Sequence, residues 1–118
     1  MKYPVSGQAT GVPDATQAIN LMGMAITTNR TLFLQKVWFF KDIVGEARVG
    51  LFDVTMATGA PSTTALKWMS GMEYDQDIIL TEEFPGNGLE FKYGCCVGLQ
   101  TSSTSTGLTI CAGVGYER

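Results

Sequence analysis

The chain has 118 residues, about the size of one domain. Of these, 45% are hydrophobic and 16% are charged, a balance that excludes an intrinsically disordered protein. The net charge is −3 and Lys and Arg form no cluster, so we expect no binding to nucleic acid. No run reaches the ~18–20 apolar residues of a membrane span, so we expect no membrane partner. Histidine, the commonest general base and metal ligand, is absent from the sequence, so we expect no catalytic residue, no metal and no cofactor.

Residues 1–17 combine Pro and Gly with little hydrophobic periodicity, which predicts an extended N-terminal arm ahead of a single β-sandwich domain over 18–118. We expect a neighbouring subunit to hold this arm, with Pro4 and Val5 among the contacts, because free termini are usually disordered. The apolar stretch 18–26 lacks the cleavage pattern of a secretion signal and is interpreted as a strand. We therefore expect synthesis in a cytoplasm.

Short segments of β type follow in chain order, separated by turns. The strongest is TLFLQKVWFFK at 31–41, which is rich in aromatic and branched residues. The PGNG sequence at 85–88 is typical of a turn. Seven or eight short strands without an amphipathic helix predict an all-β fold, a two-sheet antiparallel sandwich of jelly-roll type. The expected strands are 18–26, 31–41, 47–55, 66–69 (a strand or a helical turn), 77–84, 89–93, 95–100 and 108–116.

The strand at 31–41 does not alternate between apolar and polar residues. Side chains in a strand point alternately to the two faces of the sheet, so consecutive apolar residues place apolar groups on both. One face makes the core, and the other needs a cover of its own. We expect this second face to be a subunit interface, with a bulge after Leu34 that shifts the register as the competing interpretation. The candidate interface residues in this strand are Val37, Trp38, Phe39 and Phe40.

Two of the three cysteines form a candidate disulfide. If the Ser/Thr-rich loop 101–106 closes a hairpin, Cys96 lies opposite Cys111, at a separation that small adjustments could bridge. The competing interpretation is reduced thiols packed in the core, which cytoplasmic assembly favours. Zinc is not expected, because adjacent Cys95 and Cys96 point apart and no other ligands complete a site.

Two other side-chain groups have a functional and a structural interpretation. The carboxylates at 75, 77, 82 and 83 lie in hydrophilic stretches, so solvated charges explain them better than an acid/base pair or a calcium site. Four aromatic residues could form a sugar-stacking platform, although packing in the core and the interface explains them better. They are Trp38, Trp68, Tyr74 and Tyr93.

Several segments share a pattern with a known group of proteins. They are NRTLFL at 29–34, ARVGLFD at 47–53, FP at 84–85 with GLEF at 88–91, GCCV at 94–97 and VGYE at 114–117. Over residues 28–118 the chain resembles small phage-encoded β-sandwich virion proteins of the head decoration or cement type. The cysteine pair and the Trp38–Phe40 cluster depart from that pattern.

The resemblance implies a non-enzymatic structural protein on the capsid surface of a virion. It also implies a homo-oligomer, a trimer or another symmetric assembly, in contact with a major capsid protein. The alternative function is a receptor- or glycan-binding module of a phage tail fibre or spike.

Overall fold

The computed structural model describes residues 1–11, 19–21, 26–44, 48–55, 63–69, 78–100 and 106–118. In this part the chain forms nine β-strands and one turn of 3-10 helix, η1, at Thr63–Ala65. No helix in it is long and apolar enough to cross a membrane. The strands are β1 (Tyr3–Gly11), β2 (Ile19–Asn20), β3 (Leu32–Val44), β4 (Arg48–Asp53), β5 (Leu66–Met69), β6 (Ile78–Glu83), β7 (Leu89–Phe91), β8 (Cys95–Gln100) and β9 (Thr106–Glu117).

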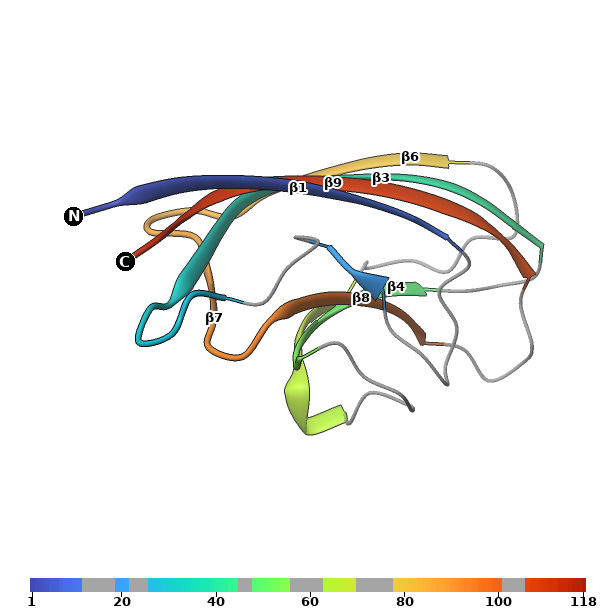
Figure 1. Cartoon of the computed structure of the whole chain (residues 1–118). Helices are drawn as coiled ribbons and strands as arrows, with labels where there is room; N and C mark the ends of the chain where they lie inside the picture. Colours follow the sequence, from blue (N-terminus) through green and yellow to red (C-terminus); the bar gives the residue numbers. More distant parts are fainter. Residues whose placement is uncertain (12–18, 22–25, 45–47, 56–62, 70–77, 101–105) are drawn as a thin grey trace.

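The strands form two antiparallel sheets that lie one over the other (Figure 1). The larger sheet has the order β1-β9-β3-β6, with the short β7 paired to β3, and the smaller has the order β2-β8-β4-β5. Successive strands lie in different sheets, with two exceptions: β4 and β5 share the smaller sheet, and β6 and the short β7 share the larger one. This alternation is the jelly-roll arrangement, so the predicted all-β, two-sheet sandwich is confirmed.

The central strand β3 contains a bulge, and its apolar residues nevertheless reach both faces of the sheet. The register between β3 and β9 shifts between Leu34 and Lys36, so the bulge after Leu34 that was considered as the alternative to a subunit interface is present. The bulge lets Leu34 and Val37, three positions apart, both point into the core. Beyond it the alternation resumes, and Trp38 faces away from the core.

The core lies between the two sheets, and an aromatic stack joins them at one side. Phe39 of β3 stacks on Trp68 of β5, with ring centroids 6.0 Å apart and planes 2° from parallel. Phe84 packs edge-on against Trp68 at 5.9 Å. The buried core residues are Leu21, Leu32, Leu34, Val37, Phe39, Val49, Leu51, Phe91, Cys95, Val97 and Cys111.

The N-terminal arm is extended, but its own chain holds it. Strand β1 pairs with β9 along all nine residues, from Tyr3 opposite Glu117 to Gly11 opposite Thr109. Val5 packs against the core. The expected contact with a neighbour is therefore not what holds residues 3–11. The expected domain boundary between residues 17 and 18 lies outside the described residues.

The Asp53 carboxylate fixes the connection between β7 and β8. Asp53 ends β4, and one of its oxygens accepts hydrogen bonds from the backbone N–H groups of Tyr93 at 2.8 Å, Lys92 at 3.0 Å and Gly94 at 3.4 Å. The loop is also tight, since a Cβ on Gly94 would lie 2.3 Å from the Val54 carbonyl oxygen. Asp53, the last residue of the segment ARVGLFD, thus has a structural role.

Candidate interaction surface

The outward face of the five-stranded sheet, turned away from the core, carries a row of apolar side chains. Strand pairing places Phe40 beside Ile110, and Trp38 beside Ala112. Val114 follows on β9, opposite Lys36 and Ser6. We call this surface the outward face; its described apolar members are Phe33, Trp38, Phe40, Ile110, Ala112, Val114 and Tyr116.

The middle of the outward face is open to solvent in the single chain. Exposed fractions are 38% for Phe40, 42% for Ile110 and 37% for Val114, whereas Phe39 between Trp38 and Phe40 is 1% exposed. A β-sandwich usually places polar side chains on this side. Three exposed apolar side chains on neighbouring strands therefore make this the candidate interaction surface of the described residues.

Of the four candidate interface residues in β3, two point outward and two do not. Trp38 is half-buried and Phe40 exposed, and both belong to the outward face. Val37, at 0% exposure, and Phe39 belong to the core and offer nothing to a partner. The strand carries apolar side chains on both faces of the sheet, and of the four candidates only Trp38 and Phe40 are placed where another molecule could contact them.

The described charges beside the uncovered middle of the outward face form one pair. Lys36 Nζ lies 3.2 Å from a Glu83 carboxylate oxygen and 5.0 Å from the centre of the Trp38 ring. Because the two charges of this pair are opposite, they give that part of the face no net charge to attract an acidic or basic partner. Contact with another molecule would be governed by apolar burial and shape.

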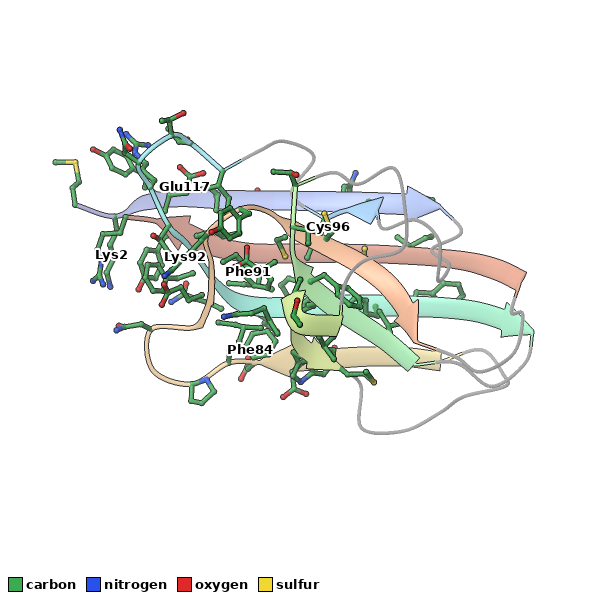
Figure 2. All side chains as sticks on the ribbon, turned by 90° about the horizontal axis from the view of Figure 1, so that it is seen from below. Lys2, Phe84, Phe91, Lys92, Cys96 and Glu117 are labelled. Atoms are coloured by element: carbon green, nitrogen blue, oxygen red, sulfur yellow. The ribbon has the colours of Figure 1, made fainter. Side chains whose placement is uncertain are left out.

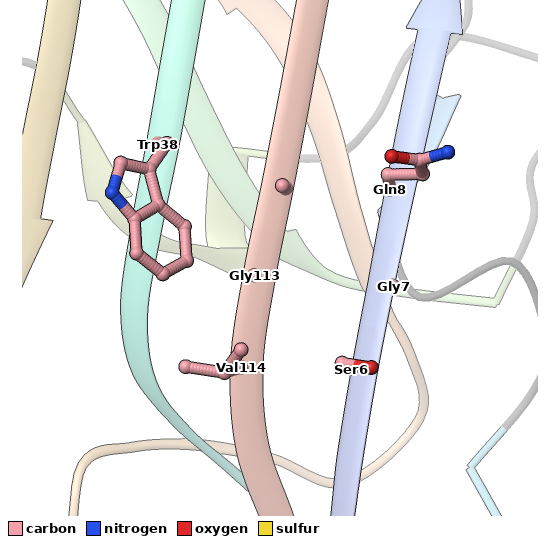
Figure 3. Close-up of a pocket in the computed structure, with 7 residues that line it drawn as sticks. Ser6, Gly7, Gln8, Trp38, Gly113 and Val114 are labelled. Carbon is pink, nitrogen blue, oxygen red and sulfur yellow. The ribbon is translucent and has the colours of Figure 1, made fainter.

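A hollow of about 420 Å³ lies in the outward face (Figure 3). It crosses from β3 over β9 to β1, and the Trp38 indole forms one side of it. Gly7 and Gly113 contribute only backbone atoms to its floor, because a side chain at either position would point to the core side with Val37, the pairing partner of Gly113. Its remaining lining residues are Ser6, Gln8, Ala112 and Val114.

The end of the outward face nearest the chain termini is covered by the chain itself. Phe33 and Tyr116 stack with ring centroids 5.2 Å apart. The Arg118 guanidinium lies 5.1 Å from the Phe33 ring centre and the Lys2 ammonium 4.6 Å from that of Tyr116. These long side chains shield aromatic surface, and Tyr116 is only 4% exposed. The uncovered part of the face is thus the middle, around Trp38.

A partly buried ion pair lies at the same end of the sandwich. Glu117 is 7% exposed and lies 3.6 Å from the Arg30 guanidinium; it also accepts a hydrogen bond from the Thr27 N–H at 3.3 Å. Arg30 in turn stacks over the Tyr3 ring at 3.7 Å. Lys2 and Glu117 both lie toward the end that carries the termini (Figure 2). The sequence pattern did not single out these charged residues, because their partners are distant along the chain.

The structure does not form the hairpin between β8 and β9 on which the candidate disulfide depended, so Cys96 does not lie opposite Cys111. The two strands belong to different sheets: Cys96 pairs with Phe52 and Asn20, whereas Cys111 pairs with Phe39 and Ala9. Both cysteines, and Cys95, are free and buried.

Burial makes these thiols unreactive. Removal from water raises the pKa of Cys96 and of Cys111 to about 11, and for Cys96 the nearby Asp53 carboxylate adds to the effect. Burial also raises the pKa of Cys95 well above its ordinary value. None of the three is therefore a nucleophile at neutral pH.

The aromatic residues of the alternative sugar-binding platform do not share a surface. Trp38 lies on the outward face, Trp68 packs against the core between the sheets, and Tyr93 lies in the loop that Asp53 holds. Tyr74 lies outside the described residues. In the same described part, no group of three or more acidic or cysteine side chains is placed to hold a metal ion.

Comparison with known proteins gives distant likenesses in structure alone. No family model matches the chain, and no curated protein matches it. A solved structure of the Tobacco streak virus coat protein dimer is similar to 97% of this chain and 86% of its own, with 11% sequence identity and a TM-score of 0.43. At that level the likeness supports no statement about function, and the jelly-roll assignment stands on the strand order of this chain.

Proposed function

We propose that this chain is a non-enzymatic structural protein of a virion that decorates and stabilises a bacteriophage capsid. The observation that carries the proposal is the uncovered apolar middle of the outward face, formed by Trp38, Phe40, Ile110 and Val114. In this proposal that surface packs against a neighbouring subunit of the particle. The resemblance described above supplies the setting: a capsid surface assembled in the host cytoplasm, with the major capsid protein as partner.

The size of the outward face suits such a contact. Nine residues of β1 at ~3.4 Å each and four strands ~4.8 Å apart give a surface of about 30 by 20 Å. Covering the whole face would bury at most ~600 Å² on each partner, or ~1,200 Å² in total, and a contact limited to the uncovered middle would bury less. That total is at the lower limit of specific protein interfaces. Contacts of this size suit a particle in which many weak attachments act together.

The proposal includes self-association into a symmetric assembly, for which the resemblance implies a trimer. A symmetric assembly repeats each contact, so the modest area of one outward face is multiplied over the particle.

Co-sedimentation with capsid shells of the phage that encodes the chain tests the proposal. The wild type is expected to pellet with the shells. A Phe40→Ser, Ile110→Ser double variant should remain in the supernatant, because it places two hydroxyls on the centre of the contact. Tyr93→Ser is the control, since Tyr93 is 65% exposed but lies away from the outward face. Wild-type protein that does not pellet would refute decoration, and an attached double variant would exclude the outward face as the contact.

A further inference from the structure

Strand β1 is an open edge of the five-stranded sheet. It pairs with β9 on one side, and no described strand pairs with its other side. Such an edge is a template for a further strand unless charged residues, bulges or short length protect it. The nine residues YPVSGQATG contain no charge, and their register with β9 is unbroken. Pro4, near the start, is the one protective residue in the strand.

Two observations indicate which backbone groups of β1 face the open side. A proline in an edge strand directs its nitrogen away from the sheet, which assigns the even-numbered residues to the open side. The Cys111 thiol donates to the Ala9 carbonyl oxygen at 3.5 Å, so the carbonyl of this odd-numbered residue is directed towards β9. The N–H and C=O groups of Ser6, Gln8 and Thr10 therefore face solvent. Their side chains are exposed as well.

We propose that a second copy of this chain adds its own β1 to this edge, antiparallel, about a two-fold axis near Gly7 or Gln8. The two five-stranded sheets then become one continuous sheet. The inference rests on the self-association in the proposed function. It names the contact: a two-fold pairing of edge strands, in place of the trimer that the resemblance implies.

The sequence of β1 suits pairing with itself. A two-fold contact uses the same surface on both copies, so each residue must tolerate its symmetry mate and its neighbours. In the registers centred on residue 7 or 8, small or neutral side chains lie opposite each other, and no like charges meet. Ser6, Gln8 and Thr10 supply three N–H donors from each copy. Pairing also covers Val5 and Ala9, which are half-buried at the margin of the core.

The edge contact is continuous with the outward face. Ser6, Gly7 and Gln8 line one side of the hollow that Trp38 closes on the other (Figure 3). A two-fold axis perpendicular to the sheet keeps the outward faces of both copies on the same side. Pairing along β1 thus places two hollows next to each other and doubles the apolar surface available to one capsid partner. A second copy fits the edge better than an unrelated strand, because one contact then both pairs the open edge and brings the two outward faces together.

Sedimentation velocity and amide hydrogen exchange of the whole chain test the proposal together. We expect twice the monomer mass at high concentration, and exchange at Ser6, Gln8 and Thr10 about tenfold or more slower than at dilution. Gln8→Pro removes an N–H from the open side without removing one from the β9 pairing, so it should be folded and monomeric. Gln8→Ala, which retains the N–H, is the control and should remain a dimer.

A second variant keeps the test decisive if Gln8→Pro does not fold. Ser6→Lys with Gln8→Lys places like charges opposite each other across the axis and should also be monomeric. A wild type that is monomeric at every concentration, or that has three times the monomer mass, overturns the proposal. So does an oligomer in which the three amides exchange freely, or protection that appears only when capsid shells are added.

The outward-face double variant separates this proposal from the proposed function. Phe40→Ser with Ile110→Ser should lose attachment to shells and still pair along β1. Gln8→Pro should no longer pair along β1, although each copy retains its outward face. If the outward-face variant no longer pairs, the self-contact is that face, and strand addition is refuted.

Discussion

Phe39 and Phe40 are adjacent in sequence, and we expect alanine at each position to have a different consequence. Phe39 is 1% exposed and stacks on Trp68, so Phe39→Ala leaves a cavity between the sheets and costs about 3–5 kcal/mol of folding free energy. Phe40 is 38% exposed, so Phe40→Ala removes a side chain that is only partly buried in the monomer. The cost to monomer stability is then about 1–2 kcal/mol.

The effect on association is the reverse. The exposed 38% of Phe40 corresponds to ~75 Å² of apolar surface, if a phenylalanine buries ~200 Å² in full. At ~25 cal/mol per Å² this surface contributes about 2 kcal/mol to a contact that covers it, which is ~30-fold in Kd. Phe39→Ala, once folded, should bind with nearly wild-type affinity.

Urea unfolding followed by circular dichroism, at a concentration where the chain is monomeric, measures the first effect. Co-sedimentation with capsid shells measures the second. Equal loss of stability in the two variants would show that Phe40 is a core residue. An unchanged Kd for Phe40→Ala would show that the outward face is not the contact, and the reasoning about its apolar surface would then be wrong.

Four further predictions concern the folded chain. Asp53→Ala should lower the unfolding free energy by about 1–3 kcal/mol in urea titrations, because three loop N–H groups lose their acceptor. A loss of less than a few tenths of a kcal/mol would contradict the structural role of Asp53. Gly115→Ala should prevent folding, since the new Cβ would lie 2.1 Å from a β3 carbonyl oxygen. At Gly86 a Cβ would meet no atom within 4 Å, but the backbone φ is +67°, so Gly86→Ala should cost only about 1 kcal/mol of stability in thermal melting. Cys96 and Cys111 should resist alkylation until denaturant is added, and all three thiols should then be labelled; two fewer labels would reveal a disulfide. Because burial raises the folded pKa of these two thiols from 9.0 to about 11, their contribution to stability should be constant below pH 9 and decrease as pH rises towards 11, since unfolded thiols lose protons first; a rise in stability between pH 9 and 11 would contradict their burial.

The predicted strands were close to the observed ones where the local pattern was strong. The stretch 31–41 became β3, 95–100 became β8, and PGNG formed the turn with a Gly88 N–H to Pro85 carbonyl bond of 3.3 Å. Within the predicted strand 18–26, Ile19–Asn20 form β2, and residues 18 and 22–25 lie outside the described residues.

The candidate interaction surface could be predicted in part. The apolar run at β3 indicated that both faces of the sheet carry apolar side chains, which places Trp38 and Phe40 outward once Val37 and Phe39 point inward. Ile110 and Val114 on β9 were not predicted. Their outward direction follows from the register with β3, which the bulge after Leu34 shifts. A register between strands about 70 residues apart is not visible in either segment.

The sequence by itself determined the all-β class, the places of most strands and the presence of more apolar side chains than one core can hold. These properties depend on the alternation and composition of neighbouring residues. Only the tertiary structure decided that β1 pairs with β9 at the edge of the larger sheet, that β8 and β9 lie in different sheets and so separate Cys96 from Cys111, and that Trp68 packs between the sheets. A loop that crosses between sheets has the same composition as one that closes a hairpin, so the choice is made by packing between distant segments.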